Sequence, residues 1–176
     1  MRLLLALGRF DNKIFLILFN HSALVRARGI AKIISKSGDG YLHILIPIAF
    51  LLFVPAVSDE LLPLFITSIL VERCVYFCLK NILKRRRPSD FLGSHQRLLT
   101  PADKFSFPSG HSSAAFLLAT VICLTTNRLE LLALMWASAV GMSRVILGVH
   151  YPGDVVAGML LGILIPILTS SIILGY

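Results

Sequence analysis

Charged side chains are scarce in this chain of 176 residues, at 15% of the sequence, whereas hydrophobic residues make up 56%. Soluble domains carry about 25% charged and about 45–50% apolar residues, so the composition excludes an ordinary soluble domain. It also excludes a disordered chain, because this much apolar surface cannot remain in water. The three cysteines lie in apolar stretches, where free cysteine usually behaves as a small buried hydrophobe, and they give no sign of a metal site. The sequence therefore predicts a small membrane protein.

Apolar stretches long enough to cross a membrane recur along the chain, since a crossing helix needs about 20 residues. Five are clear: 41–57, 61–83, 108–126, 129–147 and 152–174. A sixth, weaker segment is expected at 11–24 as a short crossing or a re-entrant helix, followed by an interfacial amphipathic helix that reaches residue 36. We therefore expect an all-α polytopic bundle of about six transmembrane helices, forming a single membrane-embedded domain over residues 1–176.

Positive charge is concentrated in one segment of the chain. The formal net charge is +8, and +5 of it comes from seven cations and two aspartates between residues 80 and 104. The cations are Lys80, Lys84, Arg85, Arg86, Arg87, Arg97 and Lys104. On charge alone, this cluster is best explained by cytoplasmic loops that collect Lys and Arg and by attraction to anionic head groups. We expect Lys84, Arg85 and Arg86 to contact lipid head groups or to anchor the chain at the membrane surface.

The expected topology brings the unusual polar residues to one membrane face. The long basic loop 84–107 joins the second and third clear spans, and the connection at 148–151 must lie on the same side. Long polar loops in compact proteins are commonly functional. Polar residues within a membrane are costly and usually serve a function, so this face is the expected site.

Two of the segments that meet on this face have groups that could bind an anion. Lys80 and Arg87 are two helical turns apart, on one face of a helix that Pro88 ends. Ser109 is a good N-cap for the next span, whose first N–H groups near Gly110 have no partner within the helix. Such a helix start favours negative charge, and His111 follows in its first turn.

A third segment adds a candidate nucleophile. Arg144 is an isolated cation near the end of one span, and His150 precedes Asp154 by four residues at the start of the next. A carboxylate that accepts one imidazole N–H fixes the tautomer and leaves the other ring nitrogen free to act as base or nucleophile. Cations, a nucleophile and an acid are the groups that phosphoryl transfer requires.

These motifs together resemble the signature of the type 2 phosphatidic acid phosphatase (PAP2) superfamily. The matching segments are Lys80-x6-Arg87-Pro88, Pro108-Ser109-Gly110-His111 and Ser143-Arg144-x5-His150-x3-Asp154. Their order and internal spacing agree with the family pattern at every signature residue, whereas the first 40 residues carry no part of it. The resemblance implies a core fold like that of the vanadium haloperoxidases.

The resemblance also implies a role for each signature residue. His150 would attack phosphorus and form a phosphohistidine, and Asp154 would hold its ring. His111 would protonate the leaving oxygen and then activate water. Lys80, Arg87 and Arg144 would bind the phosphoryl oxygens, helped by Ser109 and the N–H groups near Gly110. No metal and no cofactor are expected.

The expected function is therefore that of a metal-independent lipid phosphatase in a bacterial inner (cytoplasmic) membrane, with its site facing the periplasm or exterior. Candidate substrates are undecaprenyl diphosphate, phosphatidylglycerol phosphate, phosphatidic acid and the lipid A 1-phosphate group, and no nucleic acid partner is expected. Two alternatives stay open. One is a transport or lipid-phosphate-binding protein without hydrolysis, and the other is an intramembrane serine hydrolase that uses Ser109 with His150.

Overall fold

The structure is a computed structural model that describes residues 2–92, 98–101, 103–126, 129–173 and 175. Arg97, one of the seven cations counted between residues 80 and 104, lies outside these residues. The helices of the N-terminal half are α1 (Arg2–Asn20), α2 (Ser22–Arg26), α3 (Arg28–Ser37), α4 (Tyr41–Phe53) and α5 (Pro55–Leu83). A short 3-10 helix, η1 (Pro88–Asp90), is followed by α6 (Gly110–Thr125), α7 (Glu130–Ile146) and α8 (Pro152–Ile173). The described residues contain no strand, so the predicted all-α class is confirmed.

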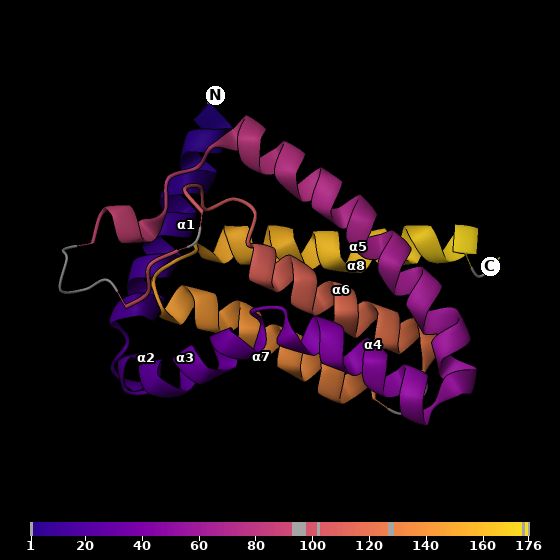
Figure 1. Ribbon diagram of the computed structural model, residues 1–176. Helices are drawn as coiled ribbons and strands as arrows, with labels where there is room; N and C mark the ends of the chain where they lie inside the picture. Colours follow the sequence, from indigo (N-terminus) through magenta and orange to yellow (C-terminus); the bar gives the residue numbers. More distant parts are fainter. Residues whose placement is uncertain (1, 93–97, 102, 127–128, 174, 176) are drawn as a thin grey trace.

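Helix α6 is the centre of the bundle and packs against α5, α7 and α8 (Figure 1). Its sequence carries no charge, and its middle is fully buried at Leu117 and Leu118. A helix that is apolar on all sides is expected in such a surrounded position. Helices α5 and α8 are long and apolar enough to cross a membrane, and α4 and α6 are shorter apolar helices.

Small residues allow α6 and α8 to approach closely. A Cβ atom added at Gly158 or Gly162 of α8 would collide with backbone carbonyl oxygens of α6, at Ser109 and Ser113 respectively. Glycines four residues apart let the backbones of membrane helices pack together. Because Gly158 lies against Ser109, this packing also fixes the start of α6 beside the start of α8, where the polar motifs meet.

The boundary between the first two clear spans differs from the prediction. The sequence suggested a connection at residues 58–60, but Ser58 lies within α5, and the chain turns at Val54. Pro55 explains the shift, because proline has no N–H to lose in the first turn of a helix and fits well there. The longer α5 therefore begins three residues before the expected turn.

The N-terminal helices gather at one end of the bundle. In Figure 1, α1 runs across the direction of α6 and α8, at the end where α8 begins. Phe15 and Phe19 of α1 pack against Val145 and Tyr151, which lie at the end of α7 and just before α8. Helix α3 packs along α7. Residues 11–24, expected as a weak crossing, therefore pack across the end of the bundle that carries the polar motifs.

Candidate active site

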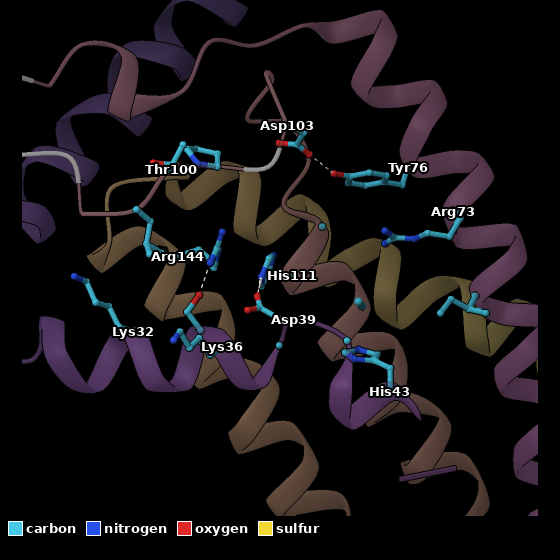
Figure 2. Close-up of a pocket in the computed structure, with 18 of the residues that line it drawn as sticks. Lys32, Lys36, Asp39, His43, Arg73, Tyr76, Thr100, Asp103, His111 and Arg144 are labelled. Carbon is cyan, nitrogen blue, oxygen red and sulfur yellow. Dashed lines mark hydrogen bonds and ion pairs between the residues drawn. The ribbon is translucent and has the colours of Figure 1, made fainter. Parts of the chain in front are cut away.

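A cavity of about 810 Å³ opens at this end of the bundle. Its lining comes from the predicted signature, from the long loop and from the N-terminal half. Gly110, His111 and Arg144 belong to the signature, whereas Asp39 and Asp103 were not predicted. Figure 2 shows His111, Arg144, Asp39 and Asp103 around the cavity. The structure thus brings together segments that the topology predicted to share one face.

His150 is buried, is not among the residues that line the cavity, and contacts two signature residues. Its Nε2 lies 3.1 Å from NH1 of Arg87, and its Nδ1 lies 3.6 Å from Oδ2 of Asp154. The second distance exceeds a hydrogen bond, so the predicted imidazole–carboxylate bond is not closed in this state. The pKa of His150 is lowered to about 4, chiefly by burial and also by the charge of Arg87, with the interaction with Asp154 opposing the shift. The imidazole is therefore neutral at pH 7, as a nucleophile must be.

The Asp154 carboxylate is fully buried and held from two sides. Oδ2 accepts the backbone N–H of Tyr151 at 2.9 Å, and Oδ1 accepts NH1 of Arg85 at 2.9 Å. Arg85 also pairs with Asp11 at 2.7 Å, and its guanidinium lies 4.0 Å from the ring centroid of Tyr151. Arg85 was expected to be a membrane anchor, but its charge is directed into the site by two carboxylates.

Asp11 of α1 joins the N-terminal helix to this network. Besides pairing with Arg85, it accepts the backbone N–H of Gly153 at 2.8 Å, in the first turn of α8. A carboxylate there satisfies one of the unpaired N–H groups of the helix start. Asp11 was missed because no sequence pattern links it to a residue so far along the chain.

Lys80 and Arg87 meet at one carboxylate. Nζ of Lys80 lies 2.5 Å from Oδ2 of Asp103, and NH2 of Arg87 pairs with Oδ1 of the same group. The hydroxyl of Tyr76 also donates to Asp103, at 2.9 Å. Burial alone would raise the pKa of Asp103, but the hydrogen bond from Lys80 and the charge of Arg87 hold it below its ordinary value. An anion already sits between the two cations that were predicted to bind phosphate.

Arg144 approaches the cavity from the end of α7. It is buried, and NH1 donates to the hydroxyl of Ser35 in α3, whereas Nε has no hydrogen-bond partner among the described residues. Its backbone carbonyl accepts the N–H groups of Val149 and His150 at 3.2 and 3.3 Å, which closes the turn that carries the histidine. A buried guanidinium with a free donor suits an anionic ligand.

The start of α6 forms as predicted. The Ser109 side chain caps the helix by accepting the N–H of Ser112 at 3.4 Å, and its own N–H donates to the Asp154 carbonyl at 2.9 Å. Ser109 is fully buried, and its hydroxyl also bonds the Ser112 hydroxyl at 3.0 Å. Gly110 instead reaches the cavity, where an added Cβ would lie 3.0 Å from the Tyr76 hydroxyl.

His111 lies in the first turn of α6 and lines the cavity. Its Nε2 is 2.6 Å from Oδ1 of Asp39, which sits in the connection between α3 and α4 (Figure 2). The sequence motifs gave the first 40 residues no part in the site. The structure therefore adds Asp39 beside one histidine, much as Asp154 lies beside the other.

Comparison with protein families settles the class of protein. The model of the PAP2 superfamily matches residues 61–174, which includes every segment of the predicted signature. The chain belongs to the PAP2 superfamily. It is accordingly a phosphatase, and the part of the chain outside the match is the N-terminal segment with Asp11 and Asp39.

Two similar proteins are named as phosphatases of lipids. An undecaprenyl-diphosphatase of Sulfolobus acidocaldarius is 29% identical over 156 residues, covering 88% of this chain and 75% of the relative. A lipid A 1-phosphatase of Rhizobium etli is 32% identical over 110 residues, and the match spans 60% of this chain and 47% of that protein.

Two solved structures share the fold. The crystal structure of LpxE from Aquifex aeolicus superposes with a TM-score of 0.75 at 28% identity, covering 93% of this chain and 94% of the other. A transmembrane PAP2-type phosphatidylglycerolphosphate phosphatase from Bacillus subtilis superposes with a TM-score of 0.73 at 27% identity, covering 95% and 86%. The membrane-embedded PAP2 fold is thus confirmed.

Proposed function

We propose that this phosphatase is an integral membrane enzyme that hydrolyses a phosphomonoester or diphosphate on a lipid through a phosphohistidine at His150. The proposal rests chiefly on one contact, the 3.1 Å separation between Nε2 of His150 and NH1 of Arg87. This contact places a neutral, buried imidazole against the guanidinium of Arg87, which can bind a phosphoryl oxygen instead. Arg87 is linked in turn to Lys80 through Asp103, so one phosphoryl group can engage both cations.

The first chemical step is attack on phosphorus. Nε2 of His150 forms the nitrogen–phosphorus bond while the bond to the leaving oxygen breaks, and His111 gives that oxygen a proton. Lys80, Arg87 and Arg144 balance the charge on the equatorial oxygens, helped by the N–H groups near Gly110 and by the Ser109 cap. The carboxylate of Asp154 stabilises the positive phosphoimidazolium.

The second step releases phosphate. His111, now neutral, removes a proton from water, and the hydroxide attacks phosphorus as the bond to His150 breaks. The enzyme returns to its starting protonation state without a metal ion or cofactor. In the absence of substrate, Asp103 holds Lys80 and Arg87 together, and the phosphoryl group replaces that carboxylate on binding.

A lipid substrate is supported by the place of the cavity and by the relatives. The cavity opens at the ends of the bundle helices, where head groups lie, and the relatives act on undecaprenyl diphosphate and lipid A, as their names state. Undecaprenyl diphosphate, phosphatidylglycerol phosphate, phosphatidic acid and lipid A 1-phosphate are therefore the substrates to test. The decisive experiment measures phosphate release from each lipid by the purified protein in detergent. No release from any of them would overturn the proposal.

We propose that the enzyme lies in the cytoplasmic membrane with its site facing the periplasm or exterior. The loop cations argue for the opposite orientation by the positive-inside rule, but Lys80, Arg87 and Arg144 have a catalytic reason for their position. Arg85 should also be omitted from the Lys and Arg count, because it is paired with Asp11 and Asp154. The charge bias that remains is correspondingly weaker.

A further inference from the structure

The cavity, at about 810 Å³, is much larger than one phosphoryl group needs. From His111 it continues along α6 past Ala114, between the start of α4 and the middle of α5. That extension is lined by His43, Ile69 and Arg73, and Figure 2 shows the first and last of these on the side away from Arg144. None of these three residues belongs to the family signature.

His43 is a buried polar group with no partner. The residue is 7% exposed, and neither Nδ1 nor Nε2 of its ring has a hydrogen-bond partner among the described residues. Buried side-chain nitrogen atoms are nearly always hydrogen-bonded, so an unpaired ring that lines a cavity indicates a missing ligand. The ring offers one N–H donor in its neutral form and two when protonated.

Arg73 supplies further donors on the opposite wall. Its Nε and NH2 bond the buried carboxylate of Glu72, at 2.5 and 2.7 Å, and NH1 makes no hydrogen bond to any described residue. The guanidinium lies 4.5 Å from the ring centroid of Tyr76, and Nζ of Lys80 lies 4.6 Å from the same centroid. Tyr76 thus joins Arg73 to the phosphoryl-binding cations. This pairing of Glu72 and Arg73 was not expected from the sequence.

The in-line geometry of phosphoryl transfer favours this extension of the cavity as the binding place of the leaving group. In phosphoryl transfer the attacking and leaving atoms lie on opposite sides of phosphorus, roughly in line. The leaving oxygen must be within reach of His111, the proposed acid, and the extension begins there. Ile44, which also lines the cavity, is 63% exposed, and an acyl or prenyl chain can pass over it into the bilayer.

We propose that His43 and Arg73 bind a second phosphate, one that belongs to the leaving group. The favoured substrates are then lipids with two phosphates, either a lipid diphosphate or a phosphomonoester on a phosphodiester head group. This inference rests on the proposed function and narrows its substrate class. A lipid whose leaving group is a plain alcohol would leave both donors without an acceptor, which lowers its transition-state binding.

The test compares pairs of lipids that share a tail. Farnesyl diphosphate is set against farnesyl phosphate, and phosphatidylglycerol phosphate against phosphatidic acid with the same acyl chains, in detergent micelles with full-length protein. We expect kcat/KM to favour the two-phosphate member of at least one pair by about tenfold or more. A preference within the first pair identifies a diphosphate, and a preference within the second identifies a phosphodiester head group.

Variants then connect the preference to the two residues. His43→Leu should lower the ratio of the two kcat/KM values about tenfold, and His43→Gln, which keeps a donor, should restore part of it. The double variant Glu72→Gln, Arg73→Gln removes the guanidinium without leaving a buried charge, and it should lower the same ratio. His21→Leu, at an exposed histidine outside the cavity, is the matched control.

Three results are distinguishable. Equal treatment of both members of each pair by the wild-type enzyme would overturn the inference while leaving the lipid phosphatase intact. An unchanged ratio in His43→Leu, with both substrates lowered together, would show a structural role and would also overturn it. No phosphate from any lipid would instead overturn the proposed function.

Discussion

Arg85 donates a hydrogen bond from NH1 to Oδ1 of Asp154 at 2.9 Å, on the carboxylate whose other oxygen faces His150. Asp154 is fully buried, so its negative charge needs a compensating partner whenever the imidazole is neutral. Arg85 provides that partner by binding Oδ1, and this leaves Oδ2 of Asp154 facing the imidazole of His150. We therefore expect Arg85 to be a positioning residue that acts on His150 through Asp154.

Replacing Arg85 by Met tests this role. Loss of one charged hydrogen bond should cost about 1–2 kcal/mol in transition-state stabilisation, which corresponds to about tenfold in kcat. KM should change less, because Arg85 does not line the cavity. Lys84→Met and Arg86→Met are matched controls, since both side chains are exposed neighbours of the same type. Equal losses in all three variants would mean that Arg85 acts only through net charge at the membrane surface.

The nucleophile is tested by His150→Ala. Turnover should fall by about a thousandfold or more, because no other described group is placed to attack phosphorus. With a ³²P-labelled substrate, the wild-type enzyme should form an acid-labile, alkali-stable phosphoenzyme that the variant lacks. Ser109→Ala should retain part of the activity, whereas a serine nucleophile would lose all of it. Full activity in His150→Ala would contradict the mechanism.

The acid is tested by His111→Ala on leaving groups of different basicity. General acid catalysis contributes about 10²–10⁴-fold, and most where the leaving oxygen is a strong base. The loss should therefore be large for phosphatidic acid and smaller for a diphosphate, whose leaving phosphate has a low pKa. A loss that is the same for both substrates would mean that His111 binds phosphate rather than protonating it.

The predicted absence of a metal is tested with vanadate and EDTA. Vanadate mimics a five-coordinate phosphoryl group and should inhibit, whereas EDTA should leave the rate unchanged. Within the described part of the chain, no group of three His, Cys, Asp or Glu side chains is placed to hold a metal ion. Loss of activity on chelation, restored by a divalent ion, would instead indicate a metal held at His111, His150 and Asp154.

The lowered pKa of His150 predicts how stability depends on pH. The folded value of about 4 lies below the ordinary value of 6.5, so the unfolded chain takes up the proton first as pH falls. Stability from this group is fully present above pH 6.5 and is lost as pH falls from 6.5 to about 4. The Tm in detergent should decline across this window more steeply in the wild type than in His150→Gln. Equal slopes would show that His150 is not buried in its neutral form.

The sequence predicted which segments come together at the site because the signature is local. Ser109, His111, His150 and Asp154 lie at helix starts, where capping rules and the short spacing between residues limit the geometry. Helices α6, α7 and α8 also begin and end within two residues of the predicted spans, since each apolar run is bounded by polar or proline residues.

The missed residues act over long separations. Asp11 contacts Gly153, 142 residues away, and Asp39 contacts His111, 72 residues away. Single carboxylates in a weakly patterned segment show no periodicity or motif that could link them to a distant partner. The role of Arg85 was missed for the same reason, because a cation in a basic loop is normally an anchor until its carboxylate partner is known.

The orientation of the site can be tested with two cysteines introduced into a variant without native cysteine. Phe91 follows η1 in the loop beside the site and is 67% exposed, and Arg9 is an exposed residue of α1. If the site faces outward, a cysteine at Phe91 should react with an impermeant maleimide in intact spheroplasts. Because Asp11 bonds Gly153 at the start of α8, Arg9 lies near the site as well, and its cysteine should be labelled from the same side.

Labelling at the two positions distinguishes which side of the membrane the site faces from whether residues 11–24 cross the membrane. Labelling of both only after lysis, in folded and active protein, would place the site in the cytoplasm, as the positive-inside rule alone predicts. Labelling of Phe91→Cys in intact spheroplasts, but of Arg9→Cys only after lysis, would mean that residues 11–24 cross the membrane, as expected from the sequence. In that case the contacts of Asp11 with Arg85 and Gly153 could not form in the bilayer, and Asp11→Asn would leave both kcat and Tm unchanged.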